Sequence, residues 1–203
     1  MSEDPEDLLW EKIAALDAEE ACTRTLADYD KIRDAYILKM FNADMDLSPG
    51  KKTITAATEE GRHLLEGLGE FAGIGALHYL VYAKDLPLAE RLIHPKELPG
   101  GEIYRKGTHM LPLDRVSRLY GSDTAGFLEK GKTLGGVQYD CGDAGILMYA
   151  FPRIPLVLAL WAESDEFPAE ATLLFDSSCR HHLPGDIIWA VAMMSIELFL
   201  RPV

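Results

Sequence analysis

The stretch AGILMYAFPRIPLVLALWA, residues 144–162, decides the fold, because it predicts a buried β-hairpin. Its two halves, 144–151 and 156–162, are apolar at almost every position, as in strands that are covered on both faces of a sheet. The junction PRIP holds prolines at 152 and 155, and neither can donate a hydrogen bond to a neighbouring strand. We therefore predict a tight hairpin at the centre of a sheet.

Segments on both sides of the hairpin predict helices and further strands. Helical spacing of apolar residues, and glycines at the ends of segments, predict one long helix from about Thr58, two short helices and an apolar core helix. The turn formers NADMDLSPG predict a loop between two short strands. The expected elements are strands at 35–41 and 52–58, a loop at 42–50, and helices at 58–83, 111–121, 122–136 and 187–200.

These elements do not alternate regularly along the chain, which favours an α+β fold over a βαβ pattern. We expect a mostly antiparallel sheet with a central buried hairpin, covered by helices. The length suits a single domain over residues 1–203. Residues 1–22 predict an acidic amphipathic helix at its periphery, with Leu9, Ile13 and Leu16 on one face.

Composition limits the classes of function. The chain has 33 acidic and 20 basic residues and a net charge of −13, which repels nucleic-acid phosphates. Its three cysteines, Cys22, Cys141 and Cys179, form no C-x-x-C motif and favour a reducing compartment. An acidic N-terminus and the absence of a long apolar run argue against a signal peptide or a membrane span. We predict a cytoplasmic protein that binds neither nucleic acid nor membrane.

The densest group of reactive side chains lies in DSSCRHH, residues 176–182. Cys179, His181 and His182, with Asp176 beside them, are competent ligands for a metal such as zinc or iron. Adjacent histidines in an extended segment point to opposite faces, so at most one should join a given site. The competing interpretation, which we favour, is a polar turn before the core helix, made by Asp176 and the serines.

Other polar residues flank the hairpin and could converge on a ligand. Paired carboxylates in the loop after the second strand can serve acid–base chemistry or bind a cation, and a solvated loop is the competing interpretation. We predict a shared cleft at one end of the hairpin, with no catalytic residue assigned. The candidate ligand-binding residues are Asp143, Arg153, Trp161, Asp165, Glu166, Asp176 and His181.

A series of motifs resembles a bacterial and archaeal family catalogued as a domain of unknown function, number 3786. The resemblance runs from about His78 to the C-terminus, and it implies an origin mainly in anaerobes. Some members of the family carry an added iron–sulfur segment, and some occur in genomes rich in corrinoid and one-carbon metabolism. It implies no established activity or catalytic residue. Without clustered cysteines, an integral iron–sulfur centre is not expected. The motifs are LHYL, ELPGGEIY, GDAGILMYAFPRIPLVLALW, DEFPAEATLLFDSS and HLP.

Three functional hypotheses follow. The first is a cytosolic binding or accessory protein with a small-molecule ligand, serving a metallocofactor or corrinoid pathway, so that a metal or a tetrapyrrole is a candidate cofactor. The second is an enzyme that uses the carboxylates and His181 in acid–base or metal-assisted chemistry. The third is an interaction protein whose N-terminal helix docks on a protein partner or forms a homodimer. An exposed apolar face formed by Leu9, Ile13 and Leu16 would favour the third.

Overall fold

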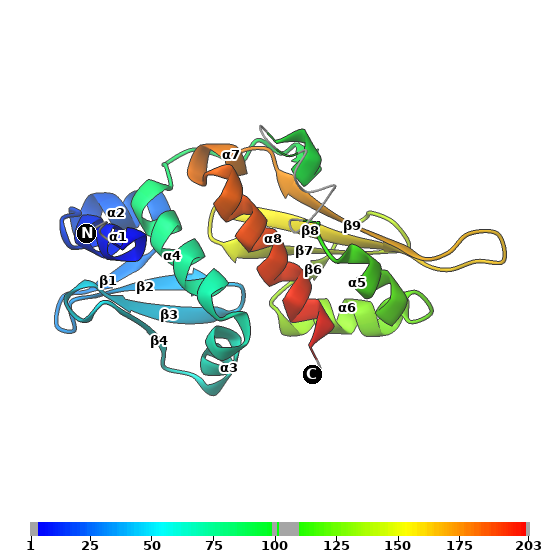
Figure 1. The fold of residues 1–203 in the computed structure, drawn as a ribbon, viewed down its shortest axis with the longest axis horizontal. Coiled ribbons are helices and arrows are strands. Elements are labelled where there is room, and N and C mark those ends of the chain that lie inside the picture. Colours follow the sequence, from blue (N-terminus) through cyan, green and yellow to red (C-terminus); the bar gives the residue numbers. More distant parts are fainter. Residues whose placement is uncertain (1–3, 99–100, 102–109, 202–203) are drawn as a thin grey trace.

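The computed structural model describes residues 4–98, 101 and 110–201. Helices and two antiparallel sheets make up the fold, which confirms the predicted α+β class (Figure 1). No helix in this described part of the chain is long and apolar enough to cross a membrane. The motif ELPGGEIY, at 97–104, lies largely outside the described residues.

The larger sheet is built around the predicted hairpin. Its strand order is β5-β9-β8-β7-β6, so the hairpin strands β7 and β8 occupy central positions. Pairing runs from Ala144 opposite Leu160 to Phe151 opposite Ile154, and nearly every side chain of β8 is buried. The hairpin is therefore confirmed. The strands are β5 (Leu92–Ile93), β6 (Val137–Gln138), β7 (Ala144–Phe151), β8 (Ile154–Trp161) and β9 (Glu170–Asp176).

The smaller sheet, with the order β1-β2-β3-β4, corrects the prediction for residues 42–50. Most of that segment is a strand, because Ala43, Met45 and Leu47 alternate with two aspartates and point into the core. This period of two outweighs the local turn preference of asparagine and aspartate. The strands are β1 (Asp28–Asp30), β2 (Ala35–Met40), β3 (Ala43–Ser48) and β4 (Thr53–Ala56).

Two predicted helices are each divided in the structure. Asp17 caps a second N-terminal helix by accepting the Glu20 N–H at 2.9 Å. Gly69 adopts φ 54 and ψ −137, a conformation that glycine accepts readily, and it separates α3 from α4. The helices are α1 (Pro5–Ala14), α2 (Ala18–Thr25), α3 (Glu59–Leu68), α4 (Glu70–Tyr82), α5 (Leu113–Tyr120), α6 (Thr124–Thr133), α7 (Cys179–His182) and α8 (Gly185–Leu200), with short 3-10 turns at Pro49–Lys51 and Pro95–Glu97.

Helices α4 and α8 pack against each other and join the two halves of the molecule (Figure 1). Helix α1 contacts α4, and its Leu9 and Ile13 are buried in the common core. Their apolar face is therefore ordinary core and is not available to a partner. The two sheets also meet directly, since the Phe41 N–H donates to the Ala150 carbonyl at 3.2 Å, where a register shift interrupts the pairing of β7 with β8.

Candidate functional site

The structure separates the residues that we expected to share a cleft. Arg153 lies in the hairpin turn, whereas Asp143 and Trp161 lie at the opposite end of β7 and β8. Eight residues of strand at 3.3 Å each place these ends roughly 25 Å apart. One ligand of ordinary size does not reach both.

The group at the far end of the hairpin consists of turn residues. Asp143 accepts the Ala162 N–H through its Oδ2 at 2.8 Å. Asp165 and Glu166 are exposed in the loop between β8 and β9, which projects away from the rest of the fold (Figure 1). Trp161 is partly exposed at the start of that loop. Asp165 and Glu166 therefore lie in a solvated loop, which was the interpretation that competed with a ligand-binding role.

Arg153 is held by backbone carbonyls and is not directed at a ligand. Its Nε donates to the Arg24 carbonyl at 2.8 Å, and its Nη1 donates to the Leu86 carbonyl at 2.9 Å. Its Nη2 contacts the Asp85 carboxylate at 2.5 Å. The guanidinium therefore ties the hairpin turn to α2 and to the segment that follows α4.

The stretch DSSCRHH forms a turn followed by the short helix α7. Asp176 ends β9, and its Oδ1 accepts the N–H groups of Ser178 and Ala89 at 2.9 and 3.0 Å. Burial alone would raise the pKa of Asp176, but these hydrogen bonds lower the pKa below 3.8 overall. Asp176 is thus an ionised turn residue, and its Oδ1 already accepts two backbone hydrogen bonds.

Cys179 is buried in α7 and is not an activated nucleophile in this structure. Burial raises the pKa of its thiol to about 12, so the thiol is protonated near neutral pH. Within residues 4–98, 101 and 110–201, no group of three or more histidine, cysteine, aspartate or glutamate side chains could hold a metal ion.

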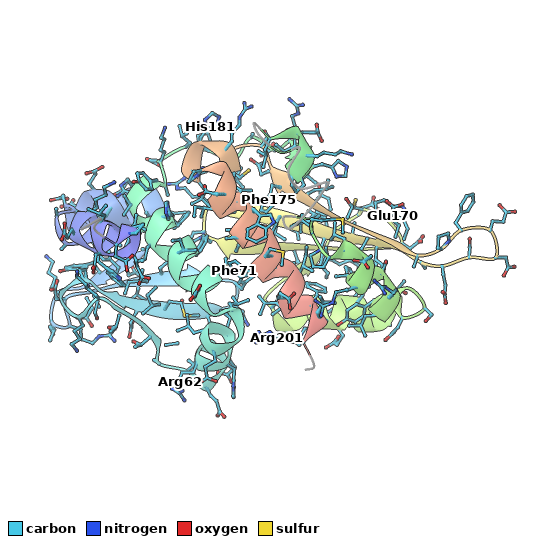
Figure 2. The ribbon with its side chains drawn as sticks, in the orientation of Figure 1. Arg62, Phe71, Glu170, Phe175, His181 and Arg201 are labelled. Atoms are coloured by element: carbon cyan, nitrogen blue, oxygen red, sulfur yellow. The ribbon has the colours of Figure 1, made fainter. Side chains whose placement is uncertain are left out.

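The two adjacent histidines nevertheless face one cavity. The segment is helical and not extended, so our argument that only one of them could join a site does not apply. The cavity has a volume of about 420 Å³ and lies between α7 and the end of α4. Figure 2 shows His181 on α7, at the upper edge of the molecule in this view. We call this cavity the histidine pocket; it is lined by His78, Tyr82, Lys84, Arg180, His181, His182, Leu183 and Pro184.

Hydrogen bonding identifies the proton position on His182. Its Nδ1 accepts the Lys84 backbone N–H at 3.2 Å, so Nδ1 carries a lone pair. Burial, together with the charges of Arg153 and His181, lowers the pKa of His182 to about 4. The ring is therefore neutral near pH 7 and must carry its proton on Nε2. This Nε2–H is buried and has no hydrogen-bond partner among the described residues.

A family comparison covers this whole region. The model for Domain of unknown function (DUF3786) matches residues 17–198. The chain belongs to this family. The DUF3786 match includes every residue of the histidine pocket, whereas α1 precedes it. No curated protein and no solved structure is detectably similar to the chain.

Two further residues of the DUF3786 domain complete the apolar wall of the pocket. The His78 ring lies 5.5 Å from the Tyr82 ring, and its Nδ1 is buried without a partner in the described part of the chain. Burial lowers the pKa of His78, and the nearby Asp186 opposes this effect. The Tyr82 hydroxyl accepts from Lys12 Nζ at 2.7 Å, which fixes the ring. His78, Tyr82 and Lys84 were absent from the predicted site, because the LHYL motif that contains His78 implies no site residue and no motif contains Tyr82 or Lys84.

Proposed function

We propose that this DUF3786 protein binds a small organic anion in the histidine pocket. One observation carries the proposal: the chain has a net charge of −13, yet the described residues that line this cavity include two cations and three imidazoles and no carboxylate. Acidic residues outnumber basic ones, so a cavity of this composition is unlike the rest of the chain. Cations that line a cavity favour a carboxylate or a phosphate group.

The hydrogen-bonding groups of the pocket suit the same ligand. Arg180 donates its Nε–H to His181 Nε2 at 3.3 Å, which leaves its two terminal nitrogens to bind both oxygens of a carboxylate or phosphate group. The unpartnered Nε2–H of His182 is a donor, and a buried donor without an acceptor costs about 1–3 kcal/mol. An anionic oxygen that reached this enclosed atom would remove that cost. A cationic ligand would instead meet Lys84 and Arg180 at close range.

The remaining walls suit a ligand with a flat apolar body. Tyr82, Leu183 and Pro184 contribute apolar surface beside the His78 ring. About 420 Å³ lies near the lower end of the range of small-molecule sites, which runs from about 300 to 1,000 Å³. This volume favours a body of one or two rings over the four pyrrole rings of a tetrapyrrole. Three free cysteines support a reducing, cytoplasmic location for such a binding protein.

Isothermal titration calorimetry with phenyl phosphate, compared with phenol, tests the proposal. Phenyl phosphate should bind and phenol should not, because only the first carries the anion. Arg180→Gln and His182→Asn should each weaken binding about tenfold, since a hydrogen bond to a charged group contributes about 1.5–3 kcal/mol. Asparagine keeps an acceptor near the position of Nδ1 and removes the Nε2–H donor.

The matched control is Arg118→Gln on α5, which removes the same charge from an exposed pair with Asp114. This variant should bind phenyl phosphate as the unsubstituted protein does. Equal binding of phenol and phenyl phosphate would show that the pocket recognises only the ring. An equal loss in R118Q and R180Q would show that only net charge matters. Either result would overturn the proposal, as would the absence of binding of both phenyl phosphate and benzoate at millimolar concentration.

A further inference from the structure

A second cavity lies at the other end of α8 and is independent of the histidine pocket. Its volume is about 210 Å³, and α3, α6, the end of α8 and the turn between β2 and β3 surround it. Figure 2 shows Arg201 at this end of α8 and His181 at the opposite end. We call it the Lys130 cavity; it is lined by Asn42, Ala43, Glu60, His63, Leu64, Lys130, Thr133, Leu134, Leu198 and Arg201.

Lys130 is the unusual member of this group. The residue is only 6% exposed, although lysine is almost never fully buried without a partner. Its amine has no hydrogen bond and no ion pair within the described part of the chain. Lys132, two residues further along α6, has an exposed side chain that pairs with Glu129 at 3.2 Å. Holding an ammonium without a partner on a largely buried side chain is unfavourable.

The surroundings of Lys130 increase the fraction of neutral amine at a given pH. Burial lowers its pKa, and the like charge of Arg201 lowers it further. A neutral amine carries a free lone pair and is the nucleophilic form of lysine. Arg201 itself has no carboxylate partner among the described residues and lines the same cavity. The cavity thus combines a nucleophile with a separate cation.

We propose that Lys130 forms a reversible imine with a small aldehyde or ketone that carries an anionic group, which Arg201 binds. The Nζ lone pair attacks the carbonyl carbon and forms a C–N bond, while the carbonyl oxygen becomes a hydroxyl group. Loss of water, in which both amine hydrogens leave with that oxygen, then gives the C=N bond. Glu60 and His63 line the same cavity and are the groups available to carry these protons.

The size of the Lys130 cavity limits the carbonyl compound. About 210 Å³ is less than the roughly 300 Å³ at which ordinary small-molecule sites begin. A short 2-oxo acid fits these dimensions, because its carbonyl carbon is directly bonded to its carboxylate. Glyoxylate, the smallest compound of this class, is therefore a suitable probe.

Reductive trapping with glyoxylate and cyanoborohydride, followed by peptide mass mapping, tests the proposal. Near neutral pH, Lys130 should gain one carboxymethyl group at least ten times faster than Lys132. Lys130→Arg keeps the charge but cannot form an imine, so that variant should lose the fast adduct. Lys132→Arg, the matched control on the same helix, should retain it.

Two further measurements keep the result interpretable. Lys130→Met should unfold at the same or a higher urea concentration, because it removes a largely buried amine that has no hydrogen-bond partner within the described residues, so loss of the adduct could not be attributed to unfolding. Arg201→Gln should slow trapping of glyoxylate about tenfold and leave propionaldehyde, which has no anionic group, unaffected. If Lys132 is labelled faster than Lys130, as the exposure of the two side chains alone would predict, the proposal is overturned. An unchanged fast adduct in K130R would also overturn it.

Discussion

Acidification should destabilise this protein through His182, which is buried as a neutral ring. The residue is 1% exposed, and its pKa is lowered from 6.5 to about 4 in the folded protein. In the unfolded chain the ring recovers an ordinary pKa near 6.5. Between these two values the unfolded chain binds a proton that the folded protein does not bind. The stability contributed by the neutral ring is therefore complete above pH 6.5 and is lost as the pH falls towards 4.

The expected magnitude follows from the two pKa values. A difference of one pKa unit corresponds to about 1.4 kcal/mol, so the free energy of unfolding should fall by roughly 2 kcal/mol between pH 7 and pH 5. The histidine pocket opens to solvent, and water near the ring reduces the cost of charging it. We therefore expect a loss of about 1–2 kcal/mol that belongs to His182.

Urea unfolding at pH 7, 6 and 5, followed by tryptophan fluorescence, measures this loss. In His182→Asn the ring is absent, so the gap in unfolding free energy between the unsubstituted protein and this variant should narrow by about 1–2 kcal/mol from pH 7 to pH 5. The control His63→Gln removes an exposed histidine of α3 and should follow the unsubstituted protein. Parallel curves for the unsubstituted protein and H182N, within about 0.3 kcal/mol, would refute the reasoning.

Other substitutions test the packing that positions the two cavities, each by urea unfolding. Arg153→Met should cost about 3 kcal/mol, because it removes charged hydrogen bonds to backbone carbonyls that connect three segments. Gly142→Ala should cost about 1–3 kcal/mol, since φ is 68 there and a Cβ would lie 2.7 Å from the Leu160 carbonyl oxygen. Gly73→Ala should instead stabilise the protein by about 0.5–1 kcal/mol, because a Cβ in α4 would meet open space. Ile13→Ala should cost about 2–5 kcal/mol if α1 belongs to the core; no loss would make α1 peripheral.

Features of the fold that depend on neighbouring residues could be predicted from the sequence. The β7–β8 hairpin followed from two apolar runs joined by prolines, and α5 and α6 followed from segments that end at glycines. The errors arose where two local signals compete. In β3, the aspartates suggest a loop while the residues between them alternate into the core. At Gly69, a helical pattern continues on both sides of a backbone conformation that no helix contains.

The histidine pocket depends on contacts that no local pattern reveals. His182 is held by the backbone of Lys84, 98 residues earlier in the chain, because α7 lies beside the segment that leaves α4. His78 belongs to the apolar helix α4, where nothing in the local sequence distinguishes it from a packing residue. The histidine pair itself was visible in the sequence, but only the helical conformation of α7 turns both rings towards one cavity. Tertiary packing therefore forms this pocket from residues that no local pattern brings together.

The electrostatics of the two cavities follow from which cations remain unpaired. Lys84 and Arg180 line the histidine pocket and Arg201 lines the Lys130 cavity, and none of these three has a carboxylate partner within the described part of the chain, although acids outnumber bases by 33 to 20. Repulsion of an anion by distant acids is screened over about 8 Å at physiological ionic strength. The lining cations act on a bound anion at contact distance. At that distance their attraction is several times larger than the screened repulsion by the distant acids. The net charge of −13 therefore does not exclude anionic ligands, because the unpaired cations at each end of α8 determine the potential that such a ligand meets.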